Sequence, residues 1–152
     1  MTTKLFIFFG LIASGKSTLA SAWAEDKQLP YFNSDIIRKE LAGIRPEQSA
    51  KDSLNQGIYT PEFSRKTYDK LLKNANKTLK DISTVLDGSY HVAAEREKII
   101  TLGQQLTIDP VFILCYCSDS ETEKRLGQRA LDPQAVSDGT LEIYKKQKLK
   151  FE

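Results

Sequence analysis

Eight residues near the N-terminus constrain the fold more than any other part of the chain. Residues 10–17 read Gly-Leu-Ile-Ala-Ser-Gly-Lys-Ser, which fits the pattern G-x-x-x-x-G-K-[ST]. An apolar run over residues 4–9 precedes them, and a segment of helical period over residues 16–26 follows. A glycine-rich turn between a strand and a helix directs backbone N–H groups toward a phosphate, and the helix N-terminus adds partial positive charge. Residues 10–17 are therefore predicted to form a phosphate-binding loop; the alternative is a glycine turn without a ligand.

The residue types in this loop match the parts of a nucleotide. Lys16 is expected to reach the β- and γ-phosphates, and Ser17 to hold Mg²⁺ through its hydroxyl. The apolar run 83–87 ends on Asp87, which fits a second Mg²⁺ ligand; an ordinary Asp-Gly turn is the alternative. The predicted nucleotide contacts are Gly10, Ala13, Ser14, Gly15, Lys16, Ser17, Thr18 and Arg125.

Apolar runs alternate with segments of helical period along the whole chain, which predicts an α/β fold with a parallel sheet. Strands are expected over residues 4–9, 30–33, 83–87 and 110–117. Helices are expected over 16–26, from 34 or 35 to about 43, 61–80, 92–106, from about 119, and from 139 or 140 to the end. Thr60-Pro61-Glu62 is a typical helix start, and Ser118 to Glu121 fits a capping box. Leu19, Trp23 and the alanines should supply the packed side of the first helix, and Phe63 is also assigned to packing. Residues 44–59 are polar, and we expect a mobile flap that contains a helical turn.

Length and composition limit the class of protein. The chain has 152 residues, 40% hydrophobic and 28% charged, which predicts one domain with a single core over residues 1–152. The formal net charge of +2 gives no general electrostatic reason to bind nucleic acid or anionic lipid. No apolar run is long enough to cross a membrane. Cys115 and Cys117 are two residues apart on a predicted strand, so they share a face, but their side chains are too far apart for an ordinary disulfide. We therefore expect reduced thiols and a cytoplasmic protein.

Asp35 and Arg38 are the candidates for chemistry on a second substrate. They follow the second predicted strand, at the carboxyl edge where open α/β sheets bind ligands. An aspartate there can accept the proton of an attacking hydroxyl, and Arg38 lies three residues further on, on the same helical face. The alternative is that Ser34 and Asp35 only cap the helix and that Arg38 is a solvated charge.

Arg125 and Arg129 stand four residues apart on a predicted helix, so their guanidinium groups share one face. Directed at a triphosphate, they would offset charge that develops on the transferred phosphoryl group. The alternative is an exposed basic face paired with Glu121 or Glu123. His91 and Arg96 are weaker candidates: His91 could contact an acceptor or be a capping or exposed residue, and Arg96 could reach the site or pair with a glutamate.

Together the loop, the Ser34-Asp35-x-x-Arg38 segment, the strand ending Leu86-Asp87-Gly88 and the two arginines resemble P-loop small-molecule kinases of the AAA-33-like type. The kinase domain of polynucleotide kinase and the zeta toxins are similar at the same positions, and the resemblance extends to Ser137-Asp138 and Tyr144. It implies ATP with Mg²⁺ as the donor. Asp35 is then the general base, Arg38 an acceptor or phosphate contact, and Arg125 and Arg129 the lid arginines. The implied fold is a nucleoside-monophosphate-kinase-like three-layer sandwich with strand order 2-3-1-4-5.

The chain departs from that family in one respect, since it ends at Phe151-Glu152 with no candidate for the fifth strand. We expect either a truncated product or a sheet completed by a neighbouring chain, and a monomer or weak homodimer. The expected function is transfer of the γ-phosphoryl group of ATP to a hydroxyl of a small molecule. The alternatives are a polynucleotide 5′-hydroxyl kinase, which the near-neutral charge does not favour, and a non-catalytic ATP-binding module or slow ATPase.

Overall fold

The computed structural model describes residues 2–47, 57–134 and 140–152. Its centre is a parallel sheet of β1 (Leu5–Phe9), β2 (Tyr31–Asn33), β3 (Thr84–Asp87) and β4 (Pro110–Leu114). The strands lie in the order β2-β3-β1-β4, which confirms the predicted α/β class and strand order. The strand pairs are in register over their whole length, from Leu5↔Thr84 and Leu5↔Pro110 onward.

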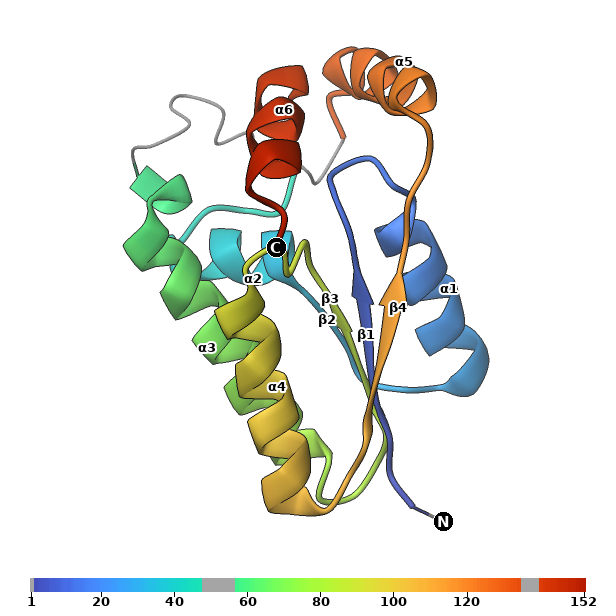
Figure 1. Ribbon diagram of the computed structural model, residues 1–152, viewed down its shortest axis with the longest axis vertical. Helices are drawn as coiled ribbons and strands as arrows, with labels where there is room; N and C mark the ends of the chain where they lie inside the picture. The colour runs from blue at the N-terminus through green and yellow to red at the C-terminus, as the bar shows by residue number, and fades with distance from the viewer. Residues whose placement is uncertain (1, 48–56, 135–139) are drawn as a thin grey trace.

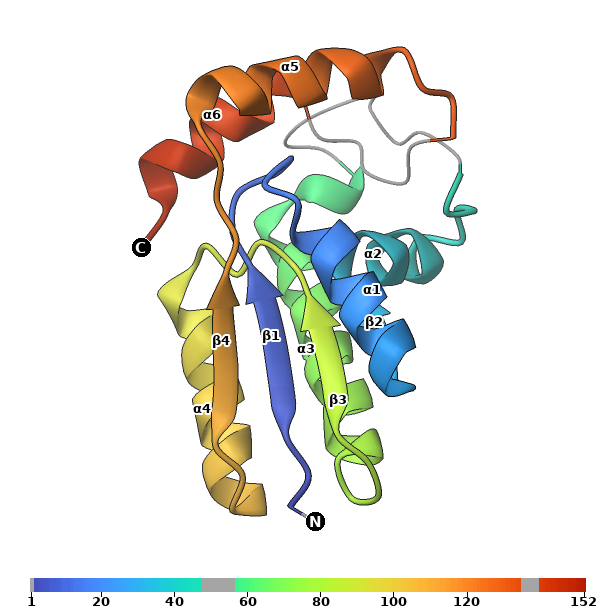
Figure 2. The same ribbon diagram turned by 90° about the vertical axis from the view of Figure 1, so that its right-hand side faces the viewer.

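Helices cover both faces of this sheet, giving three layers (Figure 1). α1 (Lys16–Lys27) covers one face, and α3 (Pro61–Thr78) and α4 (Ala93–Leu106) cover the other. α2 (Ser34–Leu41) follows β2 and packs on α3, and a short 3₁₀ helix, η1 (Gly57–Tyr59), precedes α3. Figure 2 shows α5 (Asp119–Ala130) and α6 (Leu141–Lys150) above the carboxyl ends of the strands. No helix in the described part of the chain is long and apolar enough to cross a bilayer.

The predicted helix starts are confirmed, with differences in detail. The Thr60 hydroxyl accepts a hydrogen bond from Phe63 N at 3.2 Å, with Pro61 in the first turn. Ser118 caps α5 in the same way through Glu121 N. The capping box is only half made, because the Glu121 carboxylate pairs with Arg125 at 2.9 Å.

The prediction of which residues of α1 are buried is partly wrong. Ala20 and Ala24 are the buried residues of this helix. Leu19 is 56% exposed and Trp23 is 39% exposed, although the Trp23 ring meets the edge of Phe6 at 5.7 Å between centroids. Since the small alanines face the sheet, α1 can lie close to β1 and β3, and the larger side chains stay at its flank. On the opposite face of the sheet, beneath α3 and α4, the core is a hydrophobic cluster that includes Leu71, Tyr90 and Ile99.

β4 is shorter than predicted. It ends at Leu114, paired with Phe9, and Cys115 N still donates to Phe9 O at 2.8 Å. Beyond that point β1 turns away at Gly10, so residues 115–117 have no strand to pair with. Both cysteines are free thiols, Cys115 buried and Cys117 half-buried. Residues 48–56 of the polar segment, and Ser137 with Asp138, lie outside the described residues.

Candidate active site

The phosphate-binding loop has the backbone that its glycines predict. Gly10, Ala13 and Gly15 all have positive φ, at 145°, 57° and 89°. A side chain at Gly10 is excluded, because its Cβ would lie 2.2 Å from Cys115 O. Gly15 is the N-cap of α1 and contributes no side-chain cap, so the first N–H groups of α1 keep their capacity to bind an anion.

Lys16 lies within this loop. Its Nζ donates to Leu11 O at 3.3 Å. Burial lowers the pKa of Lys16, while the nearby carboxylates of Asp87 and Asp35 act in the opposite direction. A phosphate bound by the loop would stabilise the ammonium form, because it brings negative charge to a desolvated cation.

A cavity of about 360 Å³ opens beside the loop. It brings together the predicted site residues of the loop, of α2 and of α5. Its walls are formed by Ala13, Gly15, Lys16, Ser17, Thr18, Ser21, Tyr31, Asn33, Asp35, Ile36, Arg129 and Asp132. One space is therefore bordered by the phosphate-binding groups, by the candidate base and by one of the two arginines. Gly10, Ser14, Arg38, Asp87 and Arg125 do not line this cavity.

Asp87 is fully buried at the end of β3. Its Oδ2 accepts two hydrogen bonds, from Tyr31 Oη at 2.6 Å and from Asn33 Nδ2 at 2.7 Å. Its Oδ1 has no partner among the described residues. Burial, and then the charge of Asp87, raise the pKa of Tyr31, which keeps this phenol a donor.

An unpartnered carboxylate oxygen beside the loop fits a hard cation such as Mg²⁺. Asn33 Nδ2 also lies 3.5 Å from Ser17 Oγ, so Asp87 and Ser17 are close neighbours. Within the described residues, no group of three or more His, Cys, Asp or Glu is arranged to hold a metal. Ser17 and Asp87 fit the smaller share of ligands that Mg²⁺ takes from proteins when it is bound with a nucleotide.

Asp35 is available for chemistry because another residue caps its helix. The N-cap of α2 is Asn33, whose Oδ1 accepts hydrogen bonds from Asp35 N and Ile36 N at 2.9 and 3.0 Å. The alternative that Ser34 and Asp35 only cap the helix is therefore wrong. The half-buried Asp35 lines the cavity, and burial raises the pKa of its carboxyl, opposed by Lys16 and Arg38.

Arg38 is neither solvated nor part of the cavity wall. It is 7% exposed, and its Nη1 donates to Ile58 O at 2.7 Å and to Ser64 Oγ at 2.9 Å. Its guanidinium also lies over the Tyr59 ring, 5.3 Å from the centroid. In this structure Arg38 joins α2 to η1 and α3.

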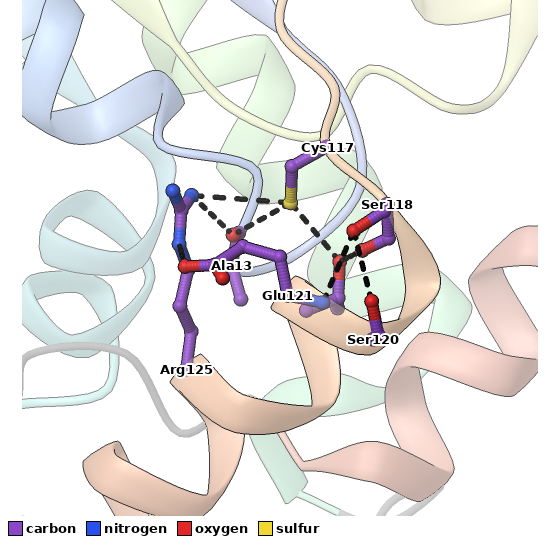
Figure 3. A network of polar contacts seen from close by, with 7 residues as sticks. Ala13, Cys117, Ser118, Ser120, Glu121 and Arg125 are labelled. Carbon is purple, nitrogen blue, oxygen red and sulfur yellow. Dashed lines mark hydrogen bonds and ion pairs between the residues drawn. The ribbon is translucent and has the colours of Figure 1, made fainter.

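The two arginines of α5 have different surroundings. Arg125 Nε pairs with Glu121, the partner proposed in the alternative interpretation, and its Nη1 donates to Ala13 O in the loop at 3.1 Å (Figure 3). The Cys117 thiol also contacts Ala13 O, at 3.6 Å. Arg129 lines the cavity. Arg125 thus connects α5 to the phosphate-binding loop, while Arg129 reaches the space where phosphates would lie.

His91 and Arg96 lie behind the site. His91 Nδ1 is 2.9 Å from Ser89 Oγ, and Ser89 is in turn bonded to Tyr68. Arg96 donates to Tyr90 O, and its guanidinium lies 5.9 and 5.8 Å from the ring centroids of Phe9 and Phe151, which stack on each other. Arg96 therefore holds the C-terminal residues against the end of β1.

Sequence reasoning missed three residues that contact the site. Tyr31 and Asn33 bind Asp87, and Gln147 of α6 accepts a hydrogen bond from Ile12 N in the loop at 3.2 Å. The role of Asn33 as a helix cap could have been predicted, because asparagine immediately before a helix is a preferred N-cap. The contacts of Tyr31 and Gln147 could not have been predicted, since their partners lie 56 and 135 residues away in the sequence.

Known proteins share this fold at low sequence identity. In all, 119 chains of solved structures match. One, described as a gluconokinase from Sinorhizobium meliloti 1021, has a TM-score of 0.65 and 17% identity over 99% of this chain and 75% of its own. Another, described as a sugar kinase from Janibacter sp. HTCC2649, has a TM-score of 0.68 and 17% identity over 100% and 79%. A third, a candidate kinase from Chloroflexus aurantiacus J-10-fl, has a TM-score of 0.69 and 22% identity over 86% and 68%.

Comparison with curated protein sequences returned no match. A family model, described as AAA domain (AAA_33), matches residues 5–152. That match includes the phosphate-binding loop, the whole sheet and both helices above it. The chain therefore belongs to the family of that model, the AAA domain (AAA_33) family.

Proposed function

We propose that this protein is an ATP-dependent kinase that transfers the γ-phosphoryl group to a hydroxyl of a small molecule. The observation that carries the proposal is the Asp35 carboxylate. It is not used to cap α2, and it faces the same cavity as Lys16 and Arg129. Nucleotide binding alone does not require a carboxylate in that position, whereas a hydroxyl kinase uses one to accept the proton of the acceptor.

Each group has a role that its surroundings support. The loop N–H groups, the N-terminus of α1 and Lys16 bind the phosphates of the donor. Ser17 and Asp87 would hold Mg²⁺, which when bound neutralises charge on the β- and γ-phosphates. The acceptor hydroxyl oxygen forms a bond to the γ-phosphorus as the bond to the β,γ-bridging oxygen breaks, giving ADP and a phosphate ester. Asp35 takes the hydroxyl proton, and Arg129 offsets charge on the transferred group.

A small polar acceptor fits the cavity better than a polymer. A space of about 360 Å³ is at the lower end of the range for small-molecule sites. Its walls are rich in hydroxyl, amide and carboxylate groups, which suit a polyhydroxylated compound. The likeness to proteins described as a gluconokinase and a sugar kinase supports a sugar or sugar acid.

The test is Mg²⁺-dependent ADP release from ATP across a panel of acceptors. The panel contains gluconate, neutral sugars, aminoglycosides, nucleosides and a 5′-hydroxyl oligonucleotide. We expect stimulation by a sugar or sugar acid, abolished in Lys16→Ala. Stimulation by the oligonucleotide alone would support the polynucleotide kinase alternative, and ATP binding without stimulation by any acceptor would support a non-catalytic module.

Asp35→Asn tests the residue that carries the proposal. We expect it to lower kcat by about 10²–10⁴-fold, because the base is lost, while ATP affinity stays near that of the wild type. The fold should be retained, since Asn33 still caps α2. Glu40→Gln, an exposed acid on the same helix, is the matched control and should leave kcat unchanged. Full turnover in Asp35→Asn would refute the proposed base.

A further inference from the structure

One amide side chain connects the two halves of the candidate active site. Asn33 lies at the junction of β2 and α2, and it is 8% exposed. Through Oδ1 it caps the helix that carries Asp35. Through Nδ2 it binds Asp87 Oδ2 at 2.7 Å and lies 3.5 Å from Ser17 Oγ. The same side chain therefore contacts both predicted Mg²⁺ ligands and holds the start of the helix that bears the base.

The hydrogen bonds assign the orientation of this amide. Two backbone N–H groups point at one end of it, so that end must be the carbonyl oxygen. The carboxylate of Asp87 faces the other end, so that end must be the NH₂ group. The reverse orientation would set donors against donors at one end and the amide oxygen against a carboxylate at the other.

Tyr31 completes the arrangement around Asp87. Its hydroxyl donates to the same carboxylate oxygen, Oδ2, at 2.6 Å. Two donors on Oδ2 leave Oδ1 as the open oxygen of a carboxylate that is fully buried. The rotation of Asp87 about its side-chain bonds is thereby restricted, and Oδ1 stays the oxygen without a hydrogen-bond partner.

We propose that Asn33 and Tyr31 are positioning residues for the Mg²⁺ site, which orient Asp87 so that only Oδ1 is offered to the cation. The inference rests on the proposed function, since it takes Ser17 and Asp87 as the Mg²⁺ ligands. Both residues line the cavity, but they orient Asp87 through the hydrogen bonds that they donate to it. Their contribution is to the affinity for the metal, because groups that orient a ligand typically change metal affinity by about 10–100-fold when they are removed.

Two variants remove these donors, and each also removes the 3.3 Å contact between Asn33 Nδ2 and Tyr31 Oη. Tyr31→Phe deletes the hydroxyl and keeps the ring. Asn33→Ser keeps a side chain that caps helices well, but it is too short to reach Asp87. Tyr116→Phe and Asn76→Ser make the same replacements at exposed positions and are the matched controls.

The readout is ADP binding measured by calorimetry, first in EDTA and then across a Mg²⁺ titration. We expect the Mg²⁺ concentration that gives half of the metal-dependent change in ADP affinity to be about 10–100-fold higher in both variants than in the wild type. Their affinity for metal-free ADP and their melting temperatures should stay near those of the controls. An unchanged Mg²⁺ requirement would overturn the inference. So would an equal loss of metal-free ADP affinity, because the side chains would then only support the loop.

No acceptor takes part in this measurement, so its result is separate from the proposed function. If the wild type phosphorylates an acceptor but both variants have the same Mg²⁺ requirement as the wild type, the inference is refuted and the kinase assignment stands. A wild-type protein whose ADP binding does not respond to Mg²⁺ would refute the metal site and the inference with it.

Discussion

Gly10 is the position at which the phosphate-binding loop leaves the sheet, and replacing it tests that geometry. Its φ of 145° lies in a region that residues with side chains rarely adopt. A methyl group there would lie 2.2 Å from Cys115 O and 3.2 Å from Cys115 C. Both atoms are backbone, and Cys115 N is bonded to Phe9 O, so neither can move without disturbing the end of β4. Gly10→Ala must therefore displace either the loop or the strand.

Two effects set the size of the loss. Backbone strain at an unfavourable φ costs about 1–3 kcal/mol. Insertion of a methyl group into a packed site costs about 1–3 kcal/mol. Gly10→Ala should therefore lower the free energy of unfolding by about 2–6 kcal/mol. For a domain of this length that corresponds to a fall in Tm of roughly 4–24 °C.

The assay is thermal unfolding followed by far-UV circular dichroism. Gly127→Ala is the matched control, because Gly127 is an exposed residue within α5 with no atom within 4 Å of an added Cβ. That variant should be slightly more stable than the wild type, by about 0.5–1 kcal/mol, since alanine favours the helix. A Gly10→Ala protein that melts within about 2 °C of the wild type would refute the close approach of the loop to β4.

Three further predictions concern titration and burial. For Asp35, burial raises the pKa of the carboxyl above the ordinary aspartate value of 3.8. The value of kcat/KM should therefore begin to fall, as the medium is acidified, at a pH above 3.8. This acidic decline should be missing from Asp35→Asn. For His91, the only histidine, burial lowers the pKa, so the unfolded chain takes up the proton first and stability is lost as the pH falls below 6.5. The Tm of His91→Gln should fall less steeply than that of the wild type between about pH 6.5 and 5, and equal slopes would contradict this. Arg38→Lys should lower the free energy of unfolding by about 1–3 kcal/mol in urea, because lysine is shorter and lacks the planar guanidinium that lies over the Tyr59 ring and reaches Ile58 O and Ser64 Oγ. An unchanged urea midpoint would be inconsistent with the buried contacts of Arg38.

Local signals predict the elements of this fold well. The start of α3 follows from Thr60 and Pro61 alone, since capping and the fixed φ of proline act within one turn. The buried face of α3 follows from helical spacing: Thr67, Leu71 and Ala75, with Leu79 at the C-cap, are buried, and Phe63 is half-buried. The parallel sheet follows from the alternation of apolar runs with helices. These properties depend on neighbours in sequence, which a single chain displays directly.

Contacts between distant elements limit what can be predicted of the site. Leu19 is apolar and at helical spacing, yet it lies at the flank of α1 because the close approach of Ala20 and Ala24 decides which side is buried. Arg38 and Asp35 are predictable as a pair on one helix. Their different environments are not predictable, because the Arg38 guanidinium binds residues of η1 and α3 whereas the Asp35 side chain lines the cavity.

The position of the single tryptophan decides which optical signal the protein gives. Trp23 lies on α1 seven residues beyond Lys16, about two turns or roughly 10 Å along the helix. Its ring contacts Phe6 and lies under the Lys27 ammonium. Intrinsic fluorescence should therefore report the packing of α1 on β1 and stay nearly silent when a nucleotide enters the loop. A tryptophan placed at Leu131, which is 86% exposed and adjoins Asp132 of the cavity wall, would give the protein an emission that follows its ligand.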